Sequence, residues 1–73
     1  MTVEQEVRAE LPGSVVAVVA AVGDDLGTTD PLVVLDSMKM EIPVAPERPG
    51  RVTAIMVSPG DTVREGDLIA RLS

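Results

Sequence analysis

The stretch that decides the fold occupies residues 12–36 and reads PGSVVAVVAAVGDDLGTTDPLVVLD. Moved forward by 37 positions, it lies without a gap over residues 49–73, PGRVTAIMVSPGDTVREGDLIARLS. Eight of the 25 aligned positions are identical, whereas ordinary composition would give roughly two. The chain is therefore an internal duplication, and its two copies should occupy equivalent places in one structure.

Working outward from this match, the copies extend over residues 3–36 and 40–73, and only residues 37–39 remain between them. Each copy has short β-branched runs that are separated by Pro-Gly and Gly-Asp turn signals, which predicts strands. The run Val15–Val22 contains alanines that suit a helix, but its valines and the Gly-Asp turn that follows favour a strand. One copy could not bury its apolar face alone. Residues 1–73 should thus form a single all-β domain, with two copies enclosing one core about a pseudo-twofold axis.

The composition excludes several classes of function. The 73 residues include no cysteine, histidine or aromatic residue, and the net charge is −6. These absences remove the usual zinc ligands, histidine-based catalysis and base stacking, and the negative charge argues against nucleic acid. The start of the chain is acidic, unlike a signal peptide, and the longest apolar run is too short to span a membrane. We expect a cytoplasmic protein that binds no metal, membrane or nucleic acid.

One residue stands out against this background. Lys39 is the only lysine in the chain, so it offers the only side-chain amine for amide chemistry. It lies at the junction of the copies, where a connection of two or three residues between strands predicts an exposed hairpin tip, at the opposite end from the chain termini. A solvated lysine is usually without function. However, tight hairpins favour Asn, Asp or Gly, and Ser37-Met38-Lys39-Met40 contains none of them. The flanking methionines would form an adaptable contact surface.

The segment Asp36-Ser37-Met38-Lys39-Met40-Glu41 resembles the attachment motif of biotinyl carrier domains, which is typically Glu-(Ala/Ser)-Met-Lys-Met. The resemblance continues through Val44-Ala45-Pro46, Pro49-Gly50-Arg51-Val52, Gly60-Asp61-Thr62-Val63 and Gly66-Asp67. It implies a flattened barrel, or barrel-sandwich hybrid, of two four-stranded antiparallel sheets with the lysine on an exposed turn. The copies have equal length, so the chain is similar to the thumbless members of this biotin/lipoyl attachment family.

The resemblance also implies a function. Biotin protein ligase would attach biotin covalently to Lys39, with Met38 and Met40 serving ligase recognition and packing beside the biotin. The non-catalytic carrier would then shuttle carboxyl groups from a biotin carboxylase to a carboxyltransferase, the partner subunits of a biotin-dependent carboxylase. A carrier of this kind is expected to be a monomer when free. The departures from the motif are small: Asp36 replaces Glu, Glu10-Leu11 replaces Ala-Pro, and Thr29 stands where the second copy has Gly66.

Other interpretations stay open at this point. A lipoyl carrier of the same fold usually has Asp-Lys-Ala around its lysine, and methionines stand at both places here. An unmodified barrel-sandwich module that only mediates assembly would leave Lys39 without a role. An enzyme is disfavoured because these residues supply no nucleophile–base pair. The initiating Met1 and the acidic start suggest a separate subunit, although a domain of a larger carboxylase would look the same.

Overall fold

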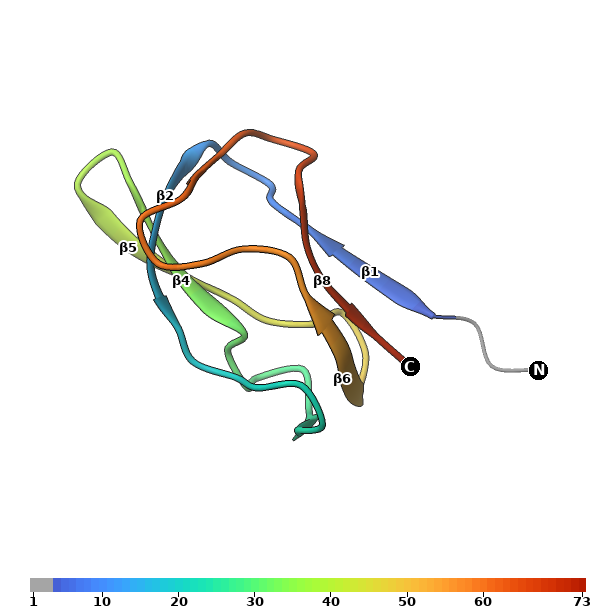
Figure 1. Ribbon diagram of the computed structural model, residues 1–73. Coiled ribbons are helices and arrows are strands. Elements are labelled where there is room, and N and C mark those ends of the chain that lie inside the picture. Colours follow the sequence, from blue (N-terminus) through green and yellow to red (C-terminus); the bar gives the residue numbers. More distant parts are fainter. Residues whose placement is uncertain (1–3) are drawn as a thin grey trace.

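The computed structural model describes residues 4–73, which form eight strands and two sheets (Figure 1). The strands are β1 (Gln5–Arg8), β2 (Gly13–Val18), β3 (Asp25–Leu26), β4 (Val33–Ser37), β5 (Met40–Val44), β6 (Gly50–Ile55), β7 (Thr62–Val63) and β8 (Leu68–Leu72). Their order is β1-β8-β6-β3 in one sheet and β5-β4-β2-β7 in the other, and all pairs are antiparallel. The predicted fold of two four-stranded antiparallel sheets is confirmed. No helix among the described residues is long and apolar enough to cross a membrane.

The duplication is visible in the strand order. Replacing each strand by its counterpart in the other copy turns the order β1-β8-β6-β3 into β5-β4-β2-β7. Each sheet therefore takes two strands from each copy, and neither copy could complete a sheet by itself. The connections between β2 and β3 and between β6 and β7 span residues 19–24 and 56–61, so both are six residues long, and neither carries an inserted thumb.

The core lies between the two sheets and is built from aliphatic side chains. Its largest fully buried members are, in order of size, Leu32, Ile69, Leu72, Val33 and Val52. Side chains along a strand normally alternate between the two faces of a sheet, but Ile69 and its neighbour Ala70 in β8 are both fully buried. The pairing of β1 with β8 skips Ile69, and an unpaired residue of this kind turns its side chain out of the regular alternation.

The turns repeat in both copies. Gly23 and Gly60 have φ angles of 99° and 94°, a conformation that favours glycine. The aspartate that follows each glycine closes the turn with its side chain. Oδ2 of Asp61 accepts a 2.9 Å hydrogen bond from the N–H of Ser58, and Oδ2 of its first-copy counterpart Asp24 accepts one of 2.9 Å from the N–H of Ala21. The run predicted as a strand from residue 15 to residue 22 is a strand only as far as Val18, and the turn closed by Asp24 begins at Ala21.

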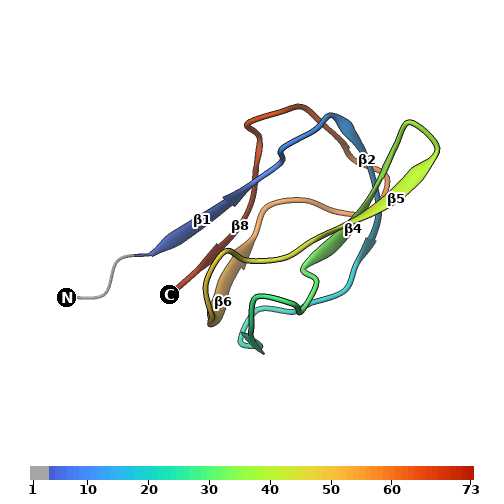
Figure 2. The same ribbon diagram turned by 180° about the vertical axis from the view of Figure 1, so that it is seen from behind.

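The two ends of the molecule differ in what they carry. The β4–β5 hairpin extends to one side, while the start of β1 and the end of β8 lie at the other (Figures 1 and 2). This arrangement agrees with the separation of Lys39 from the chain termini that the duplication predicts. The hairpin is therefore the feature to examine for function.

Candidate functional site

The hairpin between β4 and β5 has the shortest regular loop. Ser37 pairs with Met40, so Met38 and Lys39 alone form the connection. Both have positive φ angles, 52° for Met38 and 66° for Lys39, and they are the only residues other than glycine with this conformation in the described part of the chain. Positive φ at both loop positions is the signature of a type I′ turn, which favours Asn and Gly. For ordinary side chains the left-handed conformation costs roughly 1–2 kcal/mol per residue.

All three side chains at the tip of the hairpin are exposed to solvent. Met38 has 92% and Met40 61% of its surface exposed, and Lys39 is also exposed. Within residues 4–73, Lys39 makes no hydrogen bond and no ion pair. Lys39 thus stands on a convex tip rather than in a pocket, and the three predicted site residues lie together there. A partner enzyme can reach the amine from several directions.

The base of the hairpin, in contrast, is fixed to the rest of the fold. Ser37 is 6% exposed, and its Oγ donates a 2.7 Å hydrogen bond to the carbonyl oxygen of Pro12. Beside it, Gly13 lies so close to β4 that an added Cβ would be 2.7 Å from the carbonyl oxygen of Asp36. The sequence pattern predicted no role for Ser37. Its place one residue before the tip could have pointed to a supporting function, because a serine there can reach a neighbouring carbonyl.

The strands next to the tip carry unbalanced negative charge. Asp36 and Glu41 are directly opposite each other across β4 and β5, and both are exposed. Like charges at opposite positions of an antiparallel pair are destabilising. Neither carboxylate has an ion-pair partner among residues 4–73. The described residues contain no group of three or more His, Cys, Asp or Glu side chains that could hold a metal ion.

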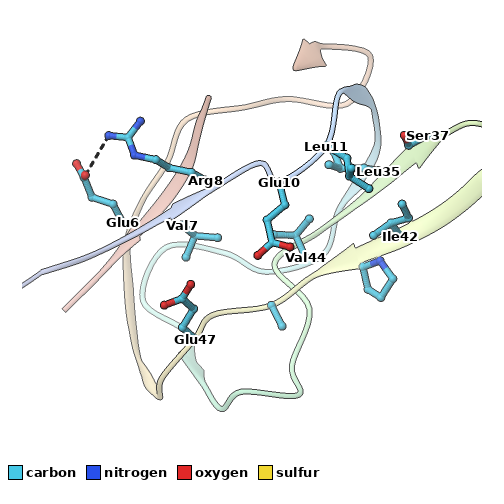
Figure 3. Close-up of a pocket in the computed structure, with 12 residues that line it drawn as sticks. Glu6, Val7, Arg8, Glu10, Leu11, Leu35, Ser37, Ile42, Val44 and Glu47 are labelled. Carbon is cyan, nitrogen blue, oxygen red and sulfur yellow. Dashed lines mark hydrogen bonds and ion pairs between the residues drawn. The ribbon is translucent and has the colours of Figure 1, made fainter. Parts of the chain in front are cut away.

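A cavity of about 240 Å³ opens between the edge strands β1 and β5 (Figure 3). Its lining includes Val7 with its counterpart Val44, and Glu10 with its counterpart Glu47, so it lies across the pseudo-twofold axis. At its rim, a hydrogen bond from Arg8 and then the charge of that guanidinium lower the pKa of Glu6 from its usual value. None of the three predicted site residues lines this cavity. It is a gap between unpaired strand edges, distinct from the tip.

The comparison with known proteins agrees with this geometry. A family model described as biotin-requiring enzyme matches residues 5–72. The chain belongs to the biotin/lipoyl attachment family. It is 51% identical over 69 residues to a biotinylated protein TB7.3 homolog of Mycobacterium leprae, covering 94% of this chain and 97% of that protein. It is 36% identical over 67 residues to a biotin/lipoyl attachment protein of Bacillus subtilis, covering 92% of each.

Two solved structures have the same fold. One is a single-chain, multi-domain long-chain acyl-CoA carboxylase, with a TM-score of 0.89 and 37% identity over 96% of this chain. The other is the urea carboxylase of Kluyveromyces lactis, with a TM-score of 0.93 and 32% identity over the whole chain. The matched regions are only 7% and 6% of those enzymes. Family and fold thus confirm the resemblance that the sequence suggested, while the roles of Lys39, Met38 and Met40 stay predictions.

Proposed function

We propose that this chain is a biotin carboxyl carrier and that biotin is attached through an amide bond to Nζ of Lys39. One observation carries the proposal: the only lysine of the chain forms half of a two-residue loop in a conformation that its side chain disfavours. A loop kept at such a cost in stability is typical of a functional site. The family membership and the biotinylated mycobacterial relative support the same assignment.

The chain supplies the amine, and a partner supplies the chemistry. A lysine amine carries a proton at neutral pH and must lose it before it can attack an activated carboxyl group. No side chain of residues 4–73 makes a hydrogen bond to Lys39 that could take this proton. Biotin protein ligase would therefore provide both the base and the positioning. Met38 and Met40, exposed on either side of Lys39, would contact the ligase and later pack beside the biotin.

The carrier role follows from the position of the tip. Attached biotin takes up a carboxyl group on its ureido ring at a biotin carboxylase and releases it at a carboxyltransferase. Because biotin is tethered, each active site meets it at a high effective concentration without tight docking of the whole domain. The barrel serves as a rigid, non-catalytic handle, cytoplasmic and monomeric when free, with these enzymes as partners and without nucleic acid, membrane or metal.

The test is the intact mass of the protein after incubation with biotin, ATP and an active biotin protein ligase. The expected result is a gain of one biotin less one water, absent from Lys39→Arg, because a guanidinium is not deprotonated under these conditions. A parallel reaction with lipoate and a lipoate ligase examines the related carrier class. Biotin on the arginine variant would refute the attachment residue. No gain in the unchanged protein, with the ligase active on a control substrate, would refute the function.

A further inference from the structure

The duplication gives the molecule two equivalent outer faces, and their chemistry differs. The face of the sheet that lacks Lys39, which we name the ion-paired face, is formed by Glu6, Asp25, Arg51, Thr53 and Arg71. The positions 37 residues away lie on the sheet that carries Lys39 and form what we name the lysine-side face: Pro43, Thr62, Ser14, Val16 and Val34. Glu6, Asp25, Arg51 and Arg71 each correspond to an uncharged residue on the second face, whereas Glu4, which also approaches Arg71, corresponds to the charged Glu41 beside the tip.

The ion-paired face satisfies its own charges. Glu6 and Arg71 are cross-strand partners, and their side chains approach to 3.5 Å. Arg8 binds the other carboxylate oxygen of Glu6 at 3.0 Å, and Arg51 binds Asp25 at 3.1 Å. All the ion pairs found among the described residues lie on this side of the molecule. The charges of this face are thus paired within the chain, unlike those of Asp36 and Glu41 beside the tip.

The lysine-side face has an apolar row at the equivalent place. Val34 and Pro43 are cross-strand partners on β4 and β5. Across the other edge of β4, Val34 pairs with Ala17, next to Val16, which is left unpaired in the β2–β4 ladder and is 46% exposed. The apolar row of Val16, Val34 and Pro43 thus crosses three neighbouring strands. The two copies share one backbone arrangement, so the fold does not require that an ion-paired row on one face is replaced by an apolar row on the other.

The apolar row is close to the attachment tip. Val34 is in β4 and precedes Lys39 by five residues, which corresponds to at most about 17 Å for an extended chain. The unpaired carboxylates of Asp36 and Glu41 lie between the row and the tip. A partner that covers about 800 Å² of this chain, as a standard interface does, would contact the tip, the carboxylates and the apolar row together.

We propose that the lysine-side face, centred on Val16, Val34 and Pro43, is the docking surface for biotin protein ligase. The fitting partner surface is apolar at its centre and carries basic side chains toward the tip, opposite Asp36 and Glu41. Charge complementarity supports this occupant, because the chain has a net charge of −6 and its two carboxylates on this side have no partner among residues 4–73.

The inference rests on the proposed function and adds the surface through which the ligase selects its lysine. Of the enzymes that meet the carrier, the ligase alone must act before any arm is attached. It has to bring its active site to a bare Lys39 and distinguish this lysine from others, which requires contacts with the folded surface around it. The carboxylase and carboxyltransferase can receive the biotin through its tether.

The first test is the kinetics of biotinylation of the double variant Val16→Thr/Val34→Thr. Threonine keeps the β-branched shape that suits a strand but makes the row polar, as Thr53 does on the ion-paired face. We expect the KM of the ligase for the carrier to rise about tenfold, or about 1.4 kcal/mol, with kcat within about twofold. The matched control is Val22→Thr, a change at a 62% exposed valine in the turn beyond β2, which should leave KM unchanged.

A second measurement locates the contact directly. The Lys39→Arg variant cannot be acylated, so its complex with the ligase does not turn over during a titration that is followed by amide NMR. The amides of β2, β4 and β5 should shift or broaden on addition of ligase, whereas those of Thr53 and Arg71 should not. Shifts confined to the hairpin loop, or equal on both faces, would overturn the proposal. Folding of the double variant is checked in the same spectra.

The outcomes separate this inference from the proposed function. If the unchanged protein takes up no biotin, the function itself fails. If it is biotinylated and the double variant has the same KM, only the docking surface fails. If the double variant is biotinylated normally but its biotinylated form is a poor substrate of the carboxylase, the face belongs to that enzyme and the ligase assignment is overturned.

Discussion

The left-handed backbone of the hairpin loop predicts that a substitution at Met38 can raise the stability of the protein while it impairs biotinylation. Met38 has a φ angle of 52° at the first position of the β4–β5 loop, a position where type I′ turns favour asparagine. Asparagine enters the left-handed region more readily than methionine does, because its short polar side chain can bond to the nearby backbone. The variant Met38→Asn should therefore be more stable than the unchanged protein.

The size of the effect can be worked from the structure. The left-handed conformation costs an ordinary residue roughly 1–2 kcal/mol, and asparagine should recover about half of it. Little is lost in exchange, since Met38 is 92% exposed and contributes almost nothing to the core. A gain of about 0.5–1 kcal/mol in the free energy of unfolding raises the Tm of a domain of this size by roughly 2–8 °C. This is about a tenth of the total free energy of unfolding, because about 0.1 kcal/mol per residue is typical.

The assay is thermal unfolding of the unmodified protein, followed by far-UV circular dichroism and by calorimetry, as the chain has no aromatic residue to report on folding. Met40→Asn is the control, because Met40 is also exposed, at 61%, but lies in β5 with an ordinary φ angle. Asparagine is disfavoured in strands, so the control should lower Tm or leave it unchanged. An equal gain in both variants, or no gain in Met38→Asn, would refute the argument from loop conformation.

The same variant should be a poorer substrate for biotinylation. The proposed function places Met38 in the contact with the ligase, so the stabilised protein would be biotinylated more slowly than the unchanged one. Opposite changes in stability and function at a single residue are the expected consequence of a site retained at a cost to the fold. A faster reaction would show that Met38 serves neither recognition nor positioning.

Three further predictions concern the supports of the tip and its surroundings. Gly13→Ala should lower the free energy of unfolding by about 1–3 kcal/mol, measured by urea denaturation, because the new Cβ would be 2.7 Å from the carbonyl oxygen of Asp36. Ser37→Ala should cost about 1 kcal/mol in the same assay, because it removes the 2.7 Å hydrogen bond that fixes the base of the hairpin. Arg8→Gln should weaken the pH dependence of Tm, because the hydrogen bond and charge of Arg8 hold the pKa of Glu6 in the folded protein below its usual value. A lowered pKa stabilises the fold above the unfolded-state value, and this stabilisation disappears as pH falls through the lowered value, so the variant should lose less Tm between about pH 6 and about pH 3.

Each of these predictions has a control in the same chain. Gly27→Ala adds a Cβ that meets only a side-chain oxygen of Asp30 at 3.6 Å, so it should have little effect, and an equal loss in both glycine variants would contradict the steric argument. Ser58→Ala removes a hydroxyl from an exposed turn and should be neutral beside Ser37→Ala. For the pH dependence, the control is Arg64→Gln, which changes an exposed arginine in the turn before β8. If this variant weakened the dependence of Tm on pH as much as Arg8→Gln, the contribution assigned to Glu6 would be refuted.

Much of this structure follows from the repeat. The gapless 37-residue match predicted two equivalent sets of strands, a short connection between them and an exposed lysine at the far end from the termini. These features depend on chain connectivity and on the burial of one shared core, which the pattern of apolar residues and turns encodes. The unfavourable residues of the turn were also visible in the sequence, since no Asn, Asp or Gly stands between Ser37 and Met40.

The remaining features depend on contacts between distant segments. Gln5 is 8% exposed, and its amide binds the backbone of Glu47 and Arg48, fixing the connection between β5 and β6 to β1. Nothing in the local sequence separates it from an ordinary surface glutamine. The extra residue at Ile69 likewise appears only when β8 is aligned with its neighbours. The periodicity of apolar residues describes one strand at a time, whereas a bulge or a buried polar side chain depends on how two segments of the chain pair or contact each other.

The two copies act as internal controls for one another, and this separates the requirements of the fold from those of function. The left-handed glycines Gly23 and Gly60 are the same in both copies, whereas Gly66 has a φ angle of 91° and its counterpart Thr29 has no positive φ angle. At the pairs Val16/Thr53 and Val34/Arg71 the strand pairing is equivalent in the two copies, so this pairing does not require the difference in polarity. We attribute the difference to the docking surface proposed for the face beside Lys39, because a domain that needed only solubility could have kept the ion-paired row on both sides.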